Sequence, residues 1–381
     1  MWPERDVTMT IRICVTGLRG FPDIMGGIEA HCQNIYPRMR AMASDLEFVV
    51  FGRAPYLPNK SFLYEGVRIQ PLWTIRQKHL ETFVHTLLSL LRARFVERAD
   101  IVHIHAVGPN LLTPLARALG LAIVATHHGD DYRRLKWGWA ARTALRLGEN
   151  LMVRFAHRVI CVSDASARKL RTRYPAHAPR ISYIPNGAAF ADDVTADETV
   201  LDTLGLRGQP FVLTVGRLVP EKGFQDLIAA FLRRENRLKL VIVGGADHDD
   251  RFSAELRQRA SAHIVFAGRR NKSELVALYR ATALFVLPSY HEGHPIAALE
   301  ALSLGAPVLL SDIEPNLEIG LLPQHYFPLG DINALSLIFA SNNFSKYKED
   351  YSTLLERYDW SQIAARTAAT LSEALAERDR G

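Results

Sequence analysis

Residues 284–312 have the sequence LFVLPSYHEGHPIAALEALSLGAPVLLSD. The apolar run at 284–289 is typical of a buried parallel strand, and Gly293 permits a turn after it. An apolar helical stretch follows, which Gly305 is expected to end, and a second apolar run occupies 307–312. The order strand, helix, strand predicts part of a parallel α/β sheet.

Two glutamates flank the predicted turn. Glu292 lies in the turn, and Glu300 lies in the helix, which we expect to begin at Pro295 because proline loses nothing at a first helical position. Helical side chains lean toward the N-terminus, so the two carboxylates are expected ~8 Å apart on one rim, at ~1.5 Å rise per residue. Ligands of such sheets bind at this rim, and the backbone N–H groups at 294–296 are expected to hold a phosphate. The alternative is a surface helix with solvated glutamates.

Apolar runs alternate with helical stretches along the whole chain. They lie at 11–17, 46–52, 67–72, 101–106, 122–128 and 158–163, and then at 211–218, 238–245, 264–268, 284–289 and 307–312. This alternation predicts two parallel α/β domains with crossover helices. We expect a first domain over residues 1–190, a linker over 191–208, a second domain over 209–358 and a final helix within 359–381.

Composition bounds the class of protein. The chain has 381 residues, 48% hydrophobic and 23% charged, which suits two globular domains. No run of eighteen uncharged apolar residues appears, and the polar N-terminus is not typical of a signal peptide. Cys14, Cys32 and Cys161 are isolated in apolar segments, which predicts buried thiols of a cytoplasmic protein and no disulfide or zinc framework.

Charge is unevenly distributed. Residues 1–190 carry 26 Lys/Arg and 14 Asp/Glu, a net charge of +12, whereas the remainder carries −6. This indicates an anionic partner: a membrane surface, a phosphate-bearing acceptor or nucleic acid. Residues 132–158 hold seven Lys/Arg against Glu149 alone, with two tryptophans. Such a segment suits an anionic membrane, or equally a core-packing helix with a solvated basic face.

Phosphate-binding residues are expected in two loops. Gly26 and Gly27 lie between the first strand and a helix, where the backbone can approach a phosphate, although a tight turn explains the pair equally well. The G-x-G-x-x-G dinucleotide spacing is absent. Arg217 and Lys222 flank the end of strand 211–218 and are predicted to contact phosphate; solvated loop charges are the alternative.

Histidines end two neighbouring strands. His127 and His128 are adjacent and therefore point to opposite faces of a strand, so we do not expect them to share a metal ion. His103 and His105 are two positions apart on one face. They are candidates for the acceptor side or for a structural role. No segment predicts a metal site.

Together these segments resemble retaining glycosyltransferases of family four with the GT-B fold, of the type that builds bacterial exopolysaccharide or lipopolysaccharide. The resemblance covers nearly the whole chain. It is carried, in the family's order, by MGGIEAH at 25–31, VATHHGDD at 124–131, VICVSDAS at 159–166, YIPNGA at 183–188, VGRLVPEKGFQDLIAAF at 215–231, FAGRRNKSELVALYRATALFVLPS at 266–289 and EGHPIAALEAL at 292–302.

The resemblance implies two Rossmann-like domains facing a cleft, with the final helix crossing back to the first. It implies transfer of a sugar from a nucleotide-sugar to a glycan acceptor, here expected to be a lipid-linked oligosaccharide of surface polysaccharide synthesis. It further implies retention of the anomeric configuration, no metal and no cofactor. We expect a cytoplasmic enzyme, peripheral on an anionic membrane surface, that binds no nucleic acid.

The resemblance also assigns roles to residues. Glu292 and His128 would bind the donor sugar at the catalytic centre, Arg217 and Lys222 the diphosphate, and Glu300 the ribose. Other donor contacts are expected at Gly26, Gly27, Gly268, Gly293, His294 and Pro295. His294 departs from the apolar residue usual in the family, which leaves the donor sugar open.

Three other classes remain as alternatives. A sugar-nucleotide epimerase of the same architecture would release an isomerised product without an acceptor. A non-enzymatic protein that binds anions or nucleic acid would use the basic half, although no nucleic-acid motif accompanies it. An NAD-dependent enzyme is disfavoured by the missing glycine fingerprint.

Overall fold

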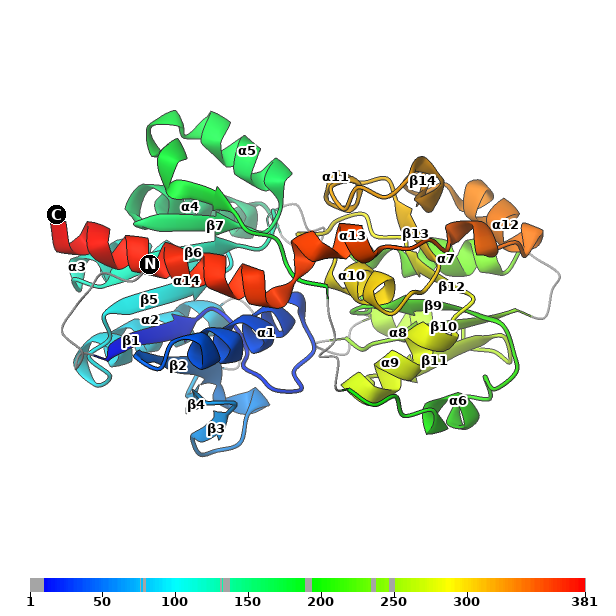
Figure 1. The fold of residues 1–381 in the computed structure, drawn as a ribbon, viewed down its shortest axis with the longest axis horizontal. Helices are drawn as coiled ribbons and strands as arrows, with labels where there is room; N and C mark the ends of the chain where they lie inside the picture. The colour runs from blue at the N-terminus through cyan, green and yellow to red at the C-terminus, as the bar shows by residue number, and fades with distance from the viewer. Residues whose placement is uncertain are drawn as a thin grey trace. The chain divides into compact units, whose positions relative to one another are not determined.

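The computed structural model describes residues 10–75, 77, 80–130, 132, 138–188, 194–233, 238–246 and 251–380. The chain divides into two compact units, Met1–Asn186 with Trp360–Gly381, and Gly187–Asp359. Each is built on a largely parallel sheet (Figure 1). The predicted α/β class with two Rossmann-like sheets is confirmed.

The first unit has an eight-stranded sheet of order β3-β4-β2-β1-β5-β6-β7-β8, in which β3 alone is antiparallel among the described strands. Its strands are β1 (Ile11–Thr16), β2 (Leu46–Arg53), β3 (Phe62–Tyr64), β4 (Val67–Leu72), β5 (Ile101–His105), β6 (Ala122–His127), β7 (Arg158–Cys161) and β8 (Ile181–Tyr183). The sheet order reverses at β1, so β1 and β5 are adjacent at the topological switch point.

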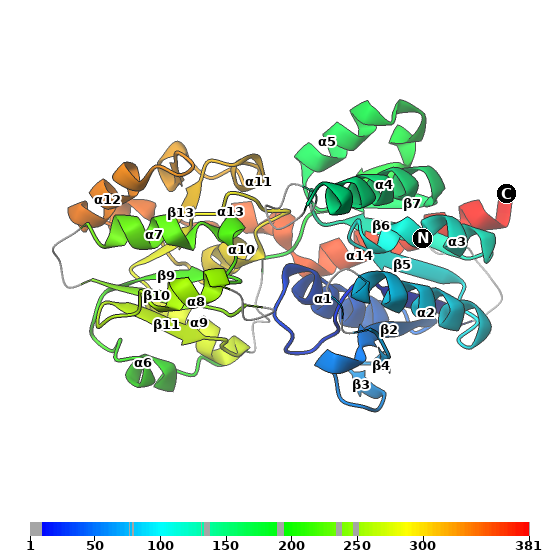
Figure 2. The same cartoon turned by 180° about the vertical axis from the view of Figure 1, so that it is seen from behind.

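Helices cover both faces of this sheet. They are α1 (Gly27–Met42), α2 (Glu81–Phe95), α3 (Thr113–Ala118), α4 (Trp139–Phe155), α5 (Asp164–Arg173) and α14 (Trp360–Arg380), with short η1 (Ala54–Tyr56), η2 (Pro109–Leu112) and η4 (Pro175–Arg180). α1 and α14 lie on the face toward the viewer in Figure 1, and α2, α3 and α4 lie on the face seen in Figure 2. The first core therefore has two apolar layers.

The final helix α14 packs on the first unit. Arg158 on β7 pairs with Glu373 at 3.0 Å and also with Glu377, and Arg378 donates to the Asp100 carbonyl at 2.8 Å. The Leu371 and Leu375 side chains of α14 are fully buried. Apolar burial and ion pairs together hold this helix on the sheet of the first unit.

The second unit has a six-stranded parallel sheet of order β11-β10-β9-β12-β13-β14. Its strands are β9 (Phe211–Val215), β10 (Lys239–Val243), β11 (Ile264–Gly268), β12 (Leu284–Leu287), β13 (Val308–Ser311) and β14 (Tyr326–Phe327). Its helices are α6 (Thr199–Thr203), α7 (Phe224–Phe231), α8 (Arg251–Arg257), α9 (Lys272–Ala281), α10 (Ile296–Ser303), α11 (Glu314–Leu317), α12 (Ile332–Ser341) and α13 (Ser352–Leu355), with η5 (Pro220–Lys222), η6 (Pro323–His325), η7 (Ser345–Tyr347) and η8 (Glu356–Tyr358).

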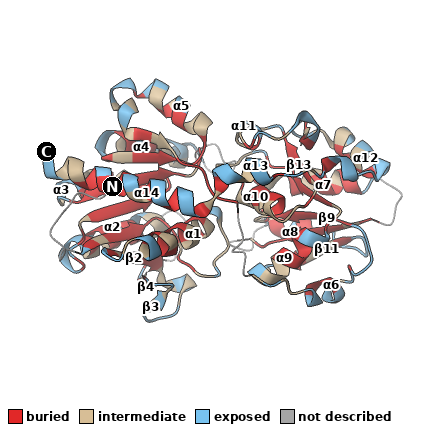
Figure 3. Cartoon of the chain, viewed as in Figure 1, coloured by how far each residue is buried: buried red, intermediate tan, exposed pale blue. Residues whose placement is uncertain are grey.

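Successive residues of these strands enter opposite cores. Val212 packs in the core with α7, α8 and α12, whereas its neighbour Leu213 packs in the core with α6, α9 and α10. Val286 and Leu287 divide in the same way. Burial on both faces explains why these strands are continuous apolar runs without alternation, as Figure 3 shows by their colour.

All eleven predicted strands are present, with ends that differ by up to three residues. The short strands β3, β8 and β14 were not predicted. The expected linker range 191–208 contains helix α6, whose Val200 and Leu201 are buried in the second core; residues 191–193 of that range lie outside the described residues. The three cysteines are buried and unpaired. Among the described residues, none of the helices combines the length and apolar composition that a membrane crossing requires.

Candidate functional site

An ion pair joins two loops at the carboxyl edge of the second sheet. Lys222 Nζ, in the loop after β9, lies 2.6 Å from Glu292 Oε1, in the loop after β12. Ser289 Oγ donates to the same oxygen at 2.6 Å. Arg217 is half-buried two residues beyond the end of β9. The structure therefore brings together Glu292 and Lys222, which the sequence analysis had assigned to the sugar and to the diphosphate separately.

Glycine makes this approach of the two loops possible. Gly223, between η5 and α7, has φ of +69°, and a Cβ at this position would lie 2.0 Å from the Pro288 carbonyl oxygen. Any other residue would separate the two loops and move Lys222 away from Glu292.

The Glu292 carboxylate is held in its charged form. Its side chain is only 9% exposed. Burial alone would raise the pKa of Glu292, but the Lys222 charge and the hydrogen bonds from Lys222 and Ser289 hold this pKa below its ordinary value. In the absence of a ligand, Lys222 thus neutralises Glu292.

Glu300 has a different environment. Its carboxylate accepts a hydrogen bond from the Tyr279 hydroxyl on α9 at 3.1 Å. Burial raises the pKa of Glu300 to about 7, although the Tyr279 hydrogen bond and Lys272 act in the opposite direction. Glu292 and Glu300 therefore have separate partners, and near neutral pH only Glu292 is fully charged.

The turn before α10 differs from the prediction in detail. Pro295 is the residue before the helix, which begins at Ile296. The expectation of open N–H groups at 294–296 was wrong for two positions: proline has no N–H, and the Ile296 N–H donates to the His294 carbonyl at 3.0 Å. His294 is buried with its ring 5.5 Å from the Tyr358 ring, and burial lowers its pKa to about 3, so it packs as a neutral aromatic group. Its role toward a donor, like that of Gly293, stays a prediction.

The other predicted glycines have local explanations. A Cβ at Gly26 would lie 2.0 Å from the Glu29 carboxylate, which is buried in an ion pair with Arg19 at 3.0 Å. A Cβ at Gly27 would meet no atom within 4 Å. Gly268 ends β11 with φ of +69° in open space. The side chains of the Glu29–Arg19 pair thus occupy the space beside Gly26, whereas the positions beside Gly27 and Gly268 are open.

In the first unit, His128 lies at the end of a hydrogen-bonded chain. His105 Nδ1 is 2.9 Å from His128 Nε2, and His105 Nε2 is 2.6 Å from the Tyr36 hydroxyl. That hydroxyl is also 2.8 Å from His103 Nδ1, and His103 Nε2 is 2.7 Å from Thr126 Oγ1. His103 and His105 are fully buried, so in this structure they act on His128 and are not themselves surface groups.

These histidines are neutral at physiological pH. Burial lowers the pKa of His103 to about 3, and burial together with neighbouring imidazoles holds the pKa values of His105 and His128 well below the usual range. His31 contributes to this effect, with its own ring 5.0 Å from the His128 ring. His128 is thus placed as a neutral hydrogen-bonding group.

The adjacent His127 belongs to another cluster. Its Nε2 lies 3.8 Å from Asp130 Oδ1 and 3.6 Å from Glu149 Oε2, all three side chains being buried. The ligand atoms of this group, and those of His31, His105 and His128, lie close enough to hold an ion in each case. Because His127 and His128 contribute to different groups, they do not form one shared site. That the enzyme needs no metal stays a prediction.

The sequence analysis missed the partners of the site residues. Tyr279 and Ser289 lie inside the segment 266–289 and Tyr36 lies on α1, but the sequence analysis assigned none of the three a role. Glu221 was also missed: it is buried, and its carboxylate accepts no hydrogen bond from the described residues. In the sequence, the only indication that Glu221 belongs to the site is its position next to Lys222.

The raised pKa of Glu300 predicts a pH-dependent stability. Between pH 4.5 and about 7 the folded state holds a proton that the unfolded state releases, so stability falls as pH rises through this window. Glu300→Gln is expected to stabilise the protein by ~1–2 kcal/mol at pH 8 and by nothing at pH 4. Urea unfolding at both pH values measures the difference.

Glu356→Gln, at an exposed position of the same unit, is the matched control and should show no such dependence. An equal effect of Glu300→Gln at both pH values would show that the carboxyl is not titrating in this window.

Comparisons with known proteins agree with this geometry. The family model for glycosyl transferases group 1 matches residues 201–320, and that for glycosyltransferase family 4 matches residues 25–190. The UDP-Gal:alpha-D-GlcNAc-diphosphoundecaprenol alpha-1,3-galactosyltransferase of Escherichia coli is 30% identical over 277 residues, covering 68% of this chain and 70% of the relative. An uncharacterised glycosyltransferase of Methanocaldococcus jannaschii is 25% identical over 91% of this chain and 94% of its own length.

Solved structures show the same fold. Sucrose-phosphate synthase from Thermosynechococcus elongatus has a TM-score of 0.78 at 21% identity, covering 94% of this chain and 98% of that chain. Anabaena HepE in complex with UDP-glucose has a TM-score of 0.75 at 20% identity, covering 95% and 99%. From its motifs, its two sheets and these matches, the chain belongs to glycosyltransferase family 4 and is a sugar-transferring enzyme of the GT-B fold.

Proposed function

We propose that the enzyme transfers a hexose from a nucleotide-sugar to a lipid-linked glycan, with retention of the anomeric configuration. The observation that carries this proposal is the Lys222–Glu292 pair, which links the loops after β9 and β12 at the carboxyl edge of the second sheet. Ligands of parallel α/β sheets bind at that edge. Family membership supports retention, and the 30% identical Escherichia coli relative, whose name specifies a diphosphoundecaprenol-linked acceptor, supports the acceptor class.

The residues have distinct proposed roles. Lys222 and Arg217 bind the diphosphate and stabilise the charge that develops on it as it leaves. When Lys222 turns to the phosphate, Glu292 loses its counter-charge and is available to the donor sugar. Glu300 accepts hydrogen bonds from the ribose. His128, neutral and fixed by His105, offers one hydrogen-bonding nitrogen to the sugar.

A transfer assay tests the proposal. Nucleotide-hexoses of uridine, guanosine and adenosine are supplied with a polyprenyl-diphosphate-linked sugar in excess chelator, and the product is analysed by proton NMR. We expect transfer that requires acceptor, with an α-linked product from an α-linked donor. An inverted product, or turnover lost in chelator and restored by magnesium or manganese, would contradict the proposal. Isomerised free nucleotide-sugar without acceptor would identify the epimerase alternative.

The donor site is tested by binding. Arg217→Ala and Lys222→Ala are each expected to weaken the binding of the preferred nucleoside diphosphate ~10-fold, because each removes a charge-assisted contact. Calorimetry in chelator measures the affinities. Arg251→Ala, which removes an exposed cation of the same unit, is the control.

The ion pair affects how Lys222→Ala is interpreted. This change leaves the buried Glu292 carboxylate without its counter-charge, which costs stability. The double variant Lys222→Ala/Glu292→Gln removes that uncompensated charge. If Arg217→Ala and the double variant both bind the nucleoside diphosphate as tightly as wild type, the diphosphate does not bind at Arg217 and Lys222.

Peripheral attachment to an anionic membrane is also proposed. α4 exposes Trp139 (82%) and Leu147 (51%) beside the exposed Arg154, and its one acid, Glu149, is buried. Of the basic segment first considered, Arg133, Arg134, Lys136 and Trp137 lie outside the described residues. Exposed apolar and cationic side chains on one helix suit the interface of an anionic bilayer.

Vesicle flotation tests attachment. The protein is expected to float with phosphatidylglycerol-containing vesicles at low salt and to remain free with pure phosphatidylcholine. Trp139→Ser/Leu147→Ser should reduce flotation, whereas Leu63→Ser, at a 73% exposed position on β3, should not. Equal recovery with both vesicle types would contradict an electrostatic attachment.

A further inference from the structure

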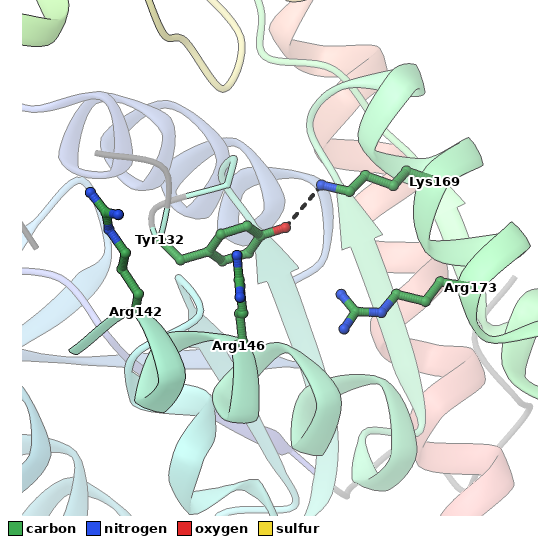
Figure 4. Close-up of a pocket in the computed structure, with 5 residues that line it drawn as sticks. All are labelled: Tyr132, Arg142, Arg146, Lys169 and Arg173. Carbon is green, nitrogen blue, oxygen red and sulfur yellow. Dashed lines mark hydrogen bonds between the residues drawn. The ribbon is translucent and has the colours of Figure 1, made fainter. Parts of the chain in front are cut away.

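The first unit contains a basic pocket that none of the assigned roles uses. It has a volume of about 470 Å³ and is lined by Tyr132, Arg142, Arg146, Lys169 and Arg173 (Figure 4). Two of the cations come from α4 and two from α5, while Tyr132 follows β6. Pockets of 300–1,000 Å³ are typical of small-ligand sites, and four cationic side chains around one pocket favour an anion.

Two of the cations are held by buried carboxylates. Lys169 bonds to Asp130, and Arg173 Nη1 lies 2.8 Å from Glu149 Oε1. These carboxylates belong to the His127 cluster, so the protein interior fixes the positions of both cations.

The other two cations are unmatched. Arg142 and Arg146 form no ion pair with any acid in the described part of the chain, and both are exposed toward solvent. The four cations and two carboxylates of this group have a net charge of +2, which matches the two negative charges of a phosphate group. A guanidinium group can bind two phosphate oxygens at once through its planar fork of N–H groups, which a chloride ion cannot match.

Tyr132 lies in the same pocket as a neutral aromatic side chain. Its hydroxyl accepts from Lys169 Nζ at 2.9 Å, and the Arg146 guanidinium lies 5.6 Å from the centre of its ring. Burial, reinforced by Asp130 and Glu149, raises the pKa of Tyr132 above its ordinary value, so the phenol keeps its hydrogen.

We propose that this pocket binds a phosphate or diphosphate group of the acceptor. The proposal rests on the proposed function, because it assigns to the pocket the anionic part of a lipid-linked acceptor. Asp130 and Tyr132 follow His128 by two and four residues after the same strand, so the pocket and the proposed sugar-contacting histidine share one loop. The pocket lies wholly in the first unit, whereas Arg217 and Lys222 belong to the second.

Binding of inorganic pyrophosphate tests the pocket. Full-length protein is first saturated with its preferred nucleoside diphosphate and then titrated with pyrophosphate by calorimetry. Arg142→Ala/Arg146→Ala is expected to weaken pyrophosphate binding ~10-fold or more while nucleoside diphosphate binding is unchanged. The control Arg94→Ala/Arg168→Ala removes two exposed cations of the same unit, on α2 and α5, and should change affinity less than ~2-fold. Circular dichroism verifies that each variant is folded.

A second arm separates free anion from lipid headgroup. Phosphatidylcholine vesicles with and without a polyprenyl diphosphate are floated with wild type, pocket variant and control. Loss of pyrophosphate binding in the pocket variant shows recognition of the anion itself. Loss of diphosphate-dependent flotation alone shows recognition of the headgroup at a surface. Equal behaviour of pocket variant and control in both arms would overturn the inference.

The two proposals fail differently. If no nucleoside diphosphate binds, the proposed function fails, and pyrophosphate titrated alone still tests the pocket. If nucleoside diphosphate binding and sugar transfer persist while the pocket variant matches its control in both arms, the function stands and the pocket assignment is wrong.

Discussion

Both sheets are buried on both faces, and this constraint determines where polar chemistry can occur. Val212 and Leu213, adjacent on β9, enter different apolar cores, so neither face of the strand can carry a reactive group. The residues assigned to the donor site therefore lie beyond the strand ends, where the backbone leaves the sheet. Lys222, Glu292 and His128 all follow parallel strands at their carboxyl ends. The fold thus concentrates its chemistry at the edges of the sheets by excluding it from their faces.

The buried carboxyl groups lie in two different electrostatic environments. Glu292 stays charged because Lys222 lies 2.6 Å away, and Asp130 and Glu149 are similarly matched by cations from α5. Glu300 forms no ion pair with a cation of the described residues, and burial raises its pKa to about 7. The difference follows from desolvation, because the free energy lost when a carboxylate is removed from water exceeds the stabilisation from one hydroxyl hydrogen bond. A ligand that brings phosphate to Lys222 therefore also changes the electrostatic state of Glu292.

Much of this was predictable, because strand and loop residues carry strong local signals. The parallel strands were found from apolar runs, and Glu292 and Lys222 from their positions beside glycine turns. Their direct pairing was not predicted, since it depends on β9 and β12 being neighbours, which is a property of sheet order. Tyr279 and Tyr36 were missed because an aromatic residue on a helix is indistinguishable from core. The basic pocket was missed because α4 and α5 contribute to it from separate segments.

The chain from Thr126 through His103, Tyr36 and His105 to His128 has a consequence for the last of these residues. Each neutral imidazole carries one hydrogen, so all four hydrogen bonds can form with every donor pointing toward His128, with every donor pointing away, or with the Tyr36 oxygen accepting from both His103 and His105. In the first arrangement His128 presents Nδ1–H outward; in the second it presents a lone pair. Conversion of the first arrangement into the second by transfer along the chain requires one hydrogen to leave His128 Nδ1 and another to enter at Thr126, because transfer within the chain alone would leave a Thr126 alkoxide and a His128 imidazolium. The direction of the hydrogen bonds in this buried chain therefore decides whether His128 Nδ1 donates a hydrogen bond or accepts one.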